Sequence, residues 1–229
     1  MVLGYRGNPT WRDMSEYVVH FCRTRAALID ILTSGAIEGR TPFGWAREYE
    51  KERDAAQQRG EKLRDYPTQK SVCLSEVPLD LLDRLVDRRG PWGLGFKKQY
   101  VVDDGGAPVW YVEKDSVLAS ALTGLQQSLT TPSQRHDWHR ITPFIDKVGE
   151  FPDGTVYRFE WEREWRVPRR LDLGMGHPAF LFAPAAEHAQ LVADLTVPGM
   201  AGTPHGIAPL LDPTWTESTL QAALSSHGL

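Results

Sequence analysis

The first apolar positions of the chain fall into two short segments with different spacing. The run Tyr17–Phe21 joins β-branched and aromatic residues, a composition that favours a strand. The next segment, Arg25–Ser34, has its apolar residues at helical spacing, and Gly35 stands where a helix would end. The pattern therefore predicts a strand that leads directly into a helix.

A charged segment follows at residues 41–70. Its central part, Arg47–Arg64, is dense in Glu, Lys, Arg, Ala and Gln and has almost no apolar face. A helix of this composition has no hydrophobic stripe to bury. We therefore expect a solvated helix, or a mobile flap or insertion.

The middle of the chain alternates apolar runs with Gly and Pro breaks. This pattern predicts strands at Ser71–Leu74, Trp92–Val102 and Pro108–Val112, and a short amphipathic helix at Leu79–Val86. The Gly-Gly pair within Asp103–Ala107 predicts a turn. We therefore expect the two strands on either side of this turn to form a hairpin.

The C-terminal half contains the longest strand pattern of the sequence, at Val156–Pro168. A shorter strand is expected at Ala179–Phe182, and helices at Ser116–Leu129 and Glu217–Ser225. The segment Pro132–Arg140 is rich in polar residues and is interpreted as a loop.

Helices and strands are interleaved, but the predicted hairpin and the irregular spacing of the elements disfavour a doubly wound parallel sheet. We expect an α+β fold with mostly antiparallel strands. A length of 229 residues lies at the upper end for one domain, and the sequence shows no repeat and no obvious linker. Residues 1–229 are therefore expected to form a single domain.

Composition narrows the classes of function. Hydrophobic residues make up 41% of the chain and charged residues 24%, which argues against both a membrane protein and a disordered one. A net charge of −4 provides no general attraction for nucleic-acid backbones. Cys22 and Cys73 lack metal-ligand spacing and are expected to be reduced core thiols. With no N-terminal leader pattern and no long apolar run, we expect a cytoplasmic protein.

The strand expected around residues 157–166 is the main candidate for chemistry. Its period of two would place Glu160, Glu162, Glu164 and Arg166 on one face, with carboxylates about 7 Å apart. One interpretation is a solvent-facing strand on which Arg166 screens Glu164. The other is a carboxylate in a cleft, where burial and like charges raise its pKa for acid or base work.

Other polar residues interrupt apolar runs and are weaker candidates. His20 lies within the first strand, and Ser75 and Glu76 follow the strand at 71–74, where they fit either a helix-capping turn or a binding site. The glycines of Trp92–Lys97 are expected to let a backbone or a ligand come close.

Taken in order, several short motifs resemble a known family. They are His20-Phe21, Val72–Glu76, Trp92–Lys97, Pro108–Tyr111 and Glu162–Arg166. This order is similar to that of the abortive-infection AbiGi-type phage-resistance proteins, and the resemblance covers about residues 17–168. The layout also resembles a diverged ADP-ribosyltransferase fold, in which NAD lies between two small antiparallel sheets.

The ADP-ribosyltransferase resemblance implies roles for individual residues. Glu164 would be the catalytic carboxylate, Glu162 would complete a Glu-x-Glu pair, and His20 would hold the NAD ribose, with Arg23 as its rival. Residues of the binding site would include Ser75, Glu76, Phe43 and Trp92. A fixed carboxylate would stabilise the positive charge that develops on the sugar as the nicotinamide bond breaks.

Three hypotheses follow from these residues. The first is a phage-defence or toxin-type protein that transfers ADP-ribose from NAD to a protein or nucleic-acid acceptor, or hydrolyses NAD, without a metal. The second is a non-catalytic antitoxin or sensor that binds a partner, such as a cognate toxin, or a nucleotide through the same cleft. The third is a metal-dependent hydrolase using the three glutamates with His136 and His139.

Overall fold

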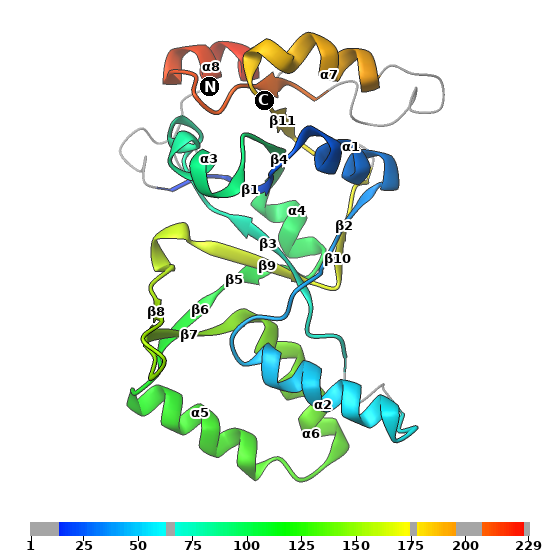
Figure 1. Ribbon diagram of the computed structural model, residues 1–229, viewed down its shortest axis with the longest axis vertical. Coiled ribbons are helices and arrows are strands. Elements are labelled where there is room, and N and C mark those ends of the chain that lie inside the picture. Colours follow the sequence, from blue (N-terminus) through cyan, green and yellow to red (C-terminus); the bar gives the residue numbers. More distant parts are fainter. Residues whose placement is uncertain (1–13, 63–66, 175–177, 196–207, 227–229) are drawn as a thin grey trace. The chain divides into compact units, whose positions relative to one another are not determined.

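The computed structural model describes residues 14–62, 67–174, 178–195 and 208–226 (Figure 1). The described chain forms two compact units. The first unit contains the described parts of residues 1–37, 74–104 and 172–229, and the second contains those of residues 38–73 and 105–171. The expectation of a single domain stays a prediction.

The first unit is built on antiparallel strands. Strand β1 (Tyr17–Cys22) pairs over its whole length with β4 (Trp92–Lys97), and Val19 of β1 lies opposite Ser75 at the end of β3 (Ser71–Ser75). Strand β11 (Phe180–Phe182) pairs antiparallel with β4, and β12 (Leu210–Leu211) runs parallel to β11. The strand order is therefore β12-β11-β4-β1-β3.

Aromatic rings and leucines fill the core of this unit. Phe180 and Phe182 of β11 pack with residues of β1, of the 3-10 turn η3 (Leu79–Leu81) and of helices α3 (Asp83–Arg89) and α8 (Glu217–Ser225). Gly93 and Gly95 of β4 make room for these rings, because a Cβ atom at either position would overlap them. The expected close approach at the glycines is thus made by aromatic rings of β11 and, at Gly93, also by the backbone carbonyl oxygen of His20.

The remaining helices of the first unit are α1 (Arg25–Ser34), α4 (Lys98–Asp103) and α7 (His188–Leu195), with the 3-10 turn η6 (Ala185–Glu187) before α7. Helix α1 begins at Thr24, whose side chain accepts a hydrogen bond from the Ala27 amide, and ends at Gly35 with φ of 71°. Both ends agree with the prediction, as do the bounds of α8. Two short strands, β2 (Ala36–Glu38) and β10 (Arg170–Asp172), pair with each other.

The second unit contains a small mixed sheet. Strand β6 (Trp110–Glu113) runs parallel to β7 (Ile145–Glu150), which pairs antiparallel with β8 (Val156–Tyr157). The first residues of β3, up to Cys73, belong to this unit, where β3 is followed in the same sheet by β9 (Glu164–Pro168) and then β5 (Ala107–Pro108), and β5 is antiparallel to β9. Helices α2 (Ala46–Gln58), α5 (Val117–Ser128) and α6 (Pro132–Ile141) complete the unit.

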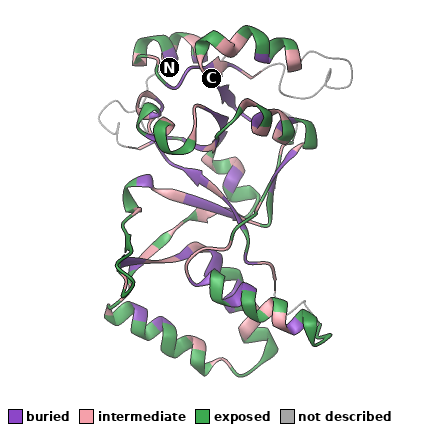
Figure 2. Ribbon diagram, viewed as in Figure 1, coloured by how far each residue is buried: buried purple, intermediate pink, exposed green. Residues whose placement is uncertain are grey.

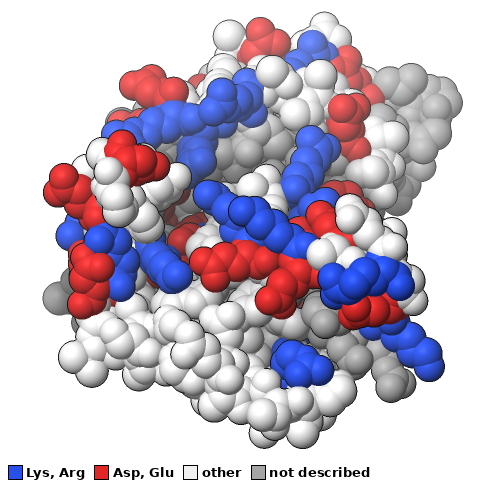
Figure 3. All heavy atoms as spheres, turned by 60° about the horizontal axis from the view of Figure 1, so that its bottom comes forward, with Lys and Arg blue, Asp and Glu red and all other residues white. Residues whose placement is uncertain are grey.

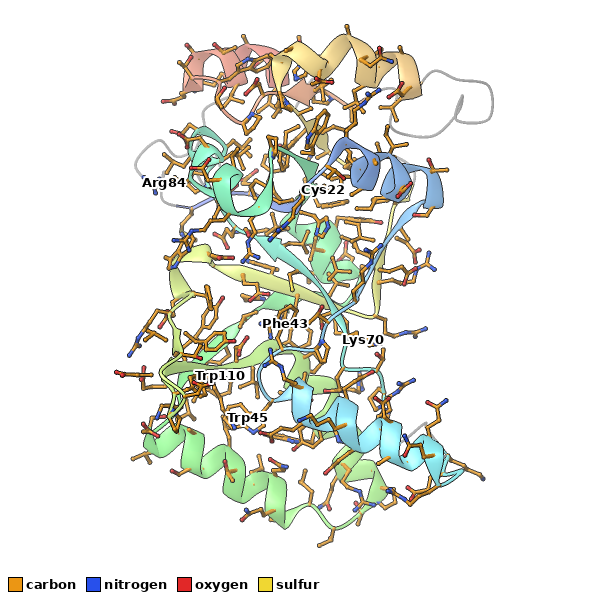
Figure 4. The ribbon with its side chains drawn as sticks, viewed as in Figure 1. Cys22, Phe43, Trp45, Lys70, Arg84 and Trp110 are labelled. Atoms are coloured by element: carbon orange, nitrogen blue, oxygen red, sulfur yellow. The ribbon has the colours of Figure 1, made fainter. Side chains whose placement is uncertain are left out.

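One hydrophobic cluster joins the sheet and all three helices of the second unit. Its members are Trp45, Tyr49, Val112, Ala119, Leu122, Trp138 and Ile145. Figure 4 shows Trp45 between the β6–β7 strands and α5, consistent with its exposed fraction of 1%. Figure 2 shows that buried residues concentrate on the strands, whereas most of α5 is exposed.

The hairpin prediction was wrong. Strand β4 ends at Lys97, and the chain continues as helix α4, which ends before Gly105 with φ of 81°. The Gly-Gly pair therefore ends a helix and does not connect two paired strands. Strand β6 instead pairs with β7, so this part of the sheet forms between segments far apart in the sequence.

The long strand expected at Val156–Pro168 is interrupted. Residues Glu160–Glu162 form a 3-10 turn, η5, and Arg163 adopts a left-handed conformation with φ of 46°. The turn is closed by hydrogen bonds from the Glu162 amide to Phe159 O and from the Arg163 amide to Glu160 O. The period-two face therefore exists only from Glu164 onward, within β9.

The polar loop expected at Pro132–Arg140 was also wrong, since this segment is helix α6. Thr131 and Gln134 form a capping box, in which each side chain accepts a hydrogen bond from the backbone amide of the other residue. Pro132 occupies the first turn, where its missing amide proton costs nothing. Helix α6 leads into the 3-10 turn η4 (Thr142–Phe144).

The helix expected in the charged segment is confirmed as α2, but it is not solvated on all sides. It buries a narrow stripe formed by Ala46, Tyr49, Glu50 and Ala56. The Trp138 indole donates a hydrogen bond of 2.6 Å to the Tyr49 hydroxyl, and the Gln69 amide donates one of 2.7 Å to Glu50. These bonds hold α2 to its neighbours within the unit.

The mixed α+β class is confirmed, and antiparallel pairing predominates in the registers given above. The likeness to ADP-ribosyltransferases stays a prediction. Among the described residues, no helix combines the length and the apolar character needed to cross a membrane.

Candidate functional site

A buried arginine organises the polar residues of the second unit. Arg166 lies on β9 with a side chain that is only 1% exposed. Its Nε donates to Glu164 Oε1 and its Nη2 to Glu164 Oε2, each at 3.0 Å. The guanidinium therefore holds both oxygens of the carboxylate that sequence analysis made the catalytic candidate.

Three further groups complete the surroundings of Arg166. Nη2 also donates to Asp146 Oδ2 on β7, and Nη1 donates to the carbonyl oxygen of Pro143 at 3.0 Å. The ring of Phe43 lies 4.7 Å from the guanidinium carbon, a cation-π distance. Each of the three guanidinium nitrogens therefore donates at least one hydrogen bond, and one face of the cation lies against an aromatic ring. We call Arg166, Glu164, Asp146, Phe43 and Tyr111 the Arg166 cluster.

Tyr111 of β6 joins the cluster through its hydroxyl, which lies 3.4 Å from Glu164 Oε2. Burial, together with the charge of Glu164, raises the pKa of Tyr111. Burial alone would lower the pKa of Arg166, but the charges of Glu164 and Asp146 outweigh it and raise that pKa. The phenol is therefore neutral and the guanidinium charged over the physiological range of pH.

The local fold explains why these side chains meet. Alternation along β9 puts Glu164 and Arg166 on one face and the buried Trp165 on the other. Tyr111 and Asp146 are directly paired between β6 and β7, so they share a face of that sheet. Gly44, with φ of 48°, lies so close to β7 that a Cβ atom there would be 2.6 Å from Asp146 Oδ1. The glycine thus lets the backbone beside Phe43 reach the cluster.

The other two glutamates do not belong to the Arg166 cluster. Glu160 is exposed and lies near Arg158, and Glu162 is 4% exposed within η5. Because the strand is interrupted before Glu164, the three carboxylates do not form a row on one strand face. The chemical role suggested for Glu162 stays a prediction.

Except for Phe43, the remaining candidate site residues lie in the first unit. His20 pairs with Leu94 across β1 and β4, and Ser75 is buried opposite Val19. Directly opposed residues share a face and consecutive residues alternate, so the side chains of His20 and Ser75 point to opposite faces of the sheet. Glu76 is buried and forms an ion pair of 2.7 Å with Lys98.

Trp92 is buried at the end of β4 opposite Cys22, and Arg23 is exposed just before α1. Their suggested roles in NAD binding stay predictions. Neither Cys22 nor Cys73 is part of a disulfide bond; Cys22 is buried and Cys73 is half-buried. Within the described ranges, no group of three or more His, Cys, Asp and Glu side chains is arranged to hold a metal ion. His139 of the third hypothesis is buried against the ring of Tyr49.

Two members of the Arg166 cluster, Asp146 and Tyr111, were not predicted from the sequence. Tyr111 could have been noticed, because it is an aromatic hydroxyl within a short apolar strand and such hydroxyls find a partner when buried. Asp146 gave no such signal, because its pairing with Arg166 depends on a contact twenty residues away in sequence.

The arrangement has a clear chemical consequence. A guanidinium that donates two hydrogen bonds to one carboxylate engages both of its oxygens and compensates its charge. The Arg166 cluster therefore joins β6, β7, β9 and the segment at Phe43 electrostatically. Glu164 could act on a sugar cation only if Arg166 released it.

Comparison with known proteins identifies a family. Residues 48–178 match a sequence-family model described as "Putative abortive phage resistance protein AbiGi, antitoxin", which covers more than half of the chain. The matched range includes the Arg166 cluster except Phe43, and most of the second unit. No curated protein and no solved structure gives a significant match.

Proposed function

The chain belongs to the AbiGi family of abortive phage-resistance proteins, and from that premise we propose that it is an antitoxin that acts by binding its cognate toxin. In this function the protein is a stoichiometric partner and catalyses no reaction. The family description names an antitoxin, which favours the non-catalytic hypothesis over the hypothesis of an NAD-consuming enzyme.

The observation that carries this proposal is the bidentate pairing of Glu164 with Arg166. An enzyme that stabilises a sugar cation needs a carboxylate whose charge is available to the substrate. Here that charge is already compensated by a side chain that is 1% exposed. Breaking the pair to free the carboxylate would leave a buried, unpaired guanidinium, which is strongly unfavourable.

The nature of the partner follows from charge. With a net charge of −4 the chain has no general attraction for phosphate backbones, so a nucleic-acid partner would need a dedicated basic patch. A protein partner needs only a complementary surface. We therefore assign a protein toxin as the partner.

NAD chemistry is the second candidate, and one observation favours it. Glu164 keeps 14% of its side-chain surface exposed, and the cluster places it with the aromatic rings of Phe43 and Tyr111. A carboxylate near aromatic rings is the combination that the ADP-ribosyltransferase resemblance implies. In this second function the ion pair with Arg166 would have to open when NAD binds.

Co-expression in bacteria tests the two functions against each other. The toxin is expressed alone and together with this chain, and both growth and the cellular NAD content are followed. The antitoxin function predicts that growth is restored by the wild type, and by Glu164→Gln once circular dichroism shows this variant folded, with NAD unchanged. If the chain lowers NAD and Glu164→Gln abolishes this effect, the protein is an enzyme. If the wild type does not restore growth, the antitoxin function is wrong.

A further inference from the structure

Helix α5 exposes apolar side chains that do not belong to the hydrophobic cluster of its own unit. The helix is anchored by Ala119 and Leu122, which are buried in the hydrophobic cluster of the second unit. Beside this buried stripe, Leu118 and Leu125 are 38% and 49% exposed, and Val117 is 88% exposed. With the exposed Ala121, they form what we call the apolar flank.

The helical spacing makes the flank continuous. Leu118, Ala121 and Leu125 follow one another at i, i+3 and i+7, and Val117 and Ala121 are separated by four residues, so these side chains lie on one side of the helix. Ser120, Thr123 and Gln127 occupy the other exposed side, which we call the polar flank. Helix α5 thus has one buried stripe, one exposed apolar flank and one exposed polar flank.

Charge is absent from this part of the sequence. From Ser116 to Gln134 there is no Asp, Glu, Lys or Arg, although these residues make up 24% of the chain. Figure 3, in which the lower part of Figure 1 comes forward, shows a broad face without charged groups beside a surface crowded with acidic and basic residues. Solvent-exposed helices normally carry charge, so this face differs from an ordinary solvated surface.

Gly124 adds an independent observation. It lies within α5, and a Cβ atom at this position would have no neighbour within 4 Å among the residues that the structure describes. Glycine inside a helix costs about 1 kcal/mol relative to alanine. No packing in the described structure requires this glycine, whereas a partner that packs closely beside Val117 and Ala121, which lie seven and three residues before it, would benefit from the missing side chain.

We propose that the apolar flank of α5 is the surface that binds the toxin, and that it inserts into an uncharged hydrophobic groove of that protein. This inference rests on the proposed antitoxin function. Apolar anchors at i, i+3 and i+7 are the pattern by which amphipathic helices bind to grooves. A charged groove would not fit, because its charges would lose water without gaining a counter-charge from α5. The partner surface that matches this uncharged flank is therefore itself apolar and uncharged.

A pair of matched variants tests the surface. Leu118→Glu with Leu125→Lys places opposite charges seven residues apart on the apolar flank. Ser120→Glu with Gln127→Lys places the same charges at the same spacing on the polar flank. Because all four side chains lie on exposed parts of one helix, circular dichroism and thermal unfolding should show both variants folded like the wild type.

The readout is the affinity for the purified toxin, identified as the protein whose growth arrest this chain relieves. We expect the apolar-flank variant to bind roughly 100-fold more weakly than the wild type and to lose the rescue of growth, while the polar-flank variant binds within about threefold. Wild-type affinity in the apolar-flank variant, or equal losses in both variants, would overturn the proposal.

Two controls distinguish failure of the proposed function from failure of the proposed binding surface. If the wild type itself neither rescues growth nor binds the toxin, the proposed function is wrong. If the wild type rescues growth and the apolar-flank variant rescues it equally well, only the binding surface is wrong. Light scattering of the chain alone adds a further outcome: a wild-type dimer that the apolar-flank variant disrupts would show that a second copy covers this flank, and would also overturn the proposal.

Discussion

Arg166 binds Glu164 through two parallel hydrogen bonds of 3.0 Å while itself being 1% exposed. The pair lies two residues apart on one strand and is completed by Asp146 from another strand. A carboxylate that sequence patterns make a catalytic candidate is thus part of the internal structure of the second unit. The first prediction tests how much stability this pairing provides.

Arg166→Met should destabilise the protein by about 3 kcal/mol, because Glu164 and Asp146 would be left close together without their shared counter-charge. The measurement is the free energy of unfolding in urea. The matched control is Arg170→Met, since Arg170 forms an exposed ion pair of 3.4 Å with Glu38. That loss should stay below about 1 kcal/mol.

Adding Glu164→Gln to Arg166→Met should recover part of the lost stability, since it removes one of the two uncompensated charges. Similar losses for the two Arg→Met variants, or no recovery in the double variant, would mean that the Arg166 cluster does not stabilise the unit.

Gly95→Ala should destabilise the first unit by about 2 kcal/mol or more. A Cβ atom at this position of β4 would overlap the ring of Phe180, which is itself fully buried and has no room to retreat. The thermal midpoint of unfolding measures the effect. An unchanged midpoint would contradict the packing of β11 against β4.

Gly124→Ala should change the free energy of unfolding in the opposite direction and stabilise the protein by about 0.5 to 1 kcal/mol. The position is helical, and the added methyl group would meet no neighbour within 4 Å in the described part of the chain. The same urea titration measures it. A loss of stability would show that something packs against this side of α5 within the protein.

Stability should fall as the pH rises above about 10, in part because of Tyr111. Burial and the charge of Glu164 raise the pKa of this phenol in the folded protein, so the unfolded chain releases the proton first. The contribution of Tyr111 is therefore constant below its unfolded pKa and is lost at higher pH. Urea unfolding of Tyr111→Phe at pH 9, 10 and 11 should show a shallower decline than the wild type, and an equal slope would contradict this.

Local patterns predicted the elements that depend on nearby residues. The bounds of α1 follow from helical spacing and from Gly35 at its end, and those of α8 from helical spacing alone. Helix α6 was missed although its signals are local, because the polar residues of Pro132–Arg140 concealed a capping box that begins at Thr131. There, capping outweighed the lack of an apolar face.

The remaining errors concern long-range contacts. The partner of β6 is β7, more than thirty residues away, and no turn residue in the sequence indicates this pairing. The strand pattern before Glu164 is interrupted by η5 and the left-handed Arg163, although the alternation of residues continues through both. Alternation alone therefore could not show that only Glu164 and Arg166 share a face, or that Asp146 and Phe43 would surround them.

The most direct test of the account is a titration of purified toxin with this chain, followed by the toxin's own activity. Binding predicts that inhibition is immediate, is complete near equimolar amounts and requires no NAD. Complete inhibition by a small fraction of an equivalent, increasing with time and dependent on NAD, would contradict the account and show that the protein acts as an enzyme.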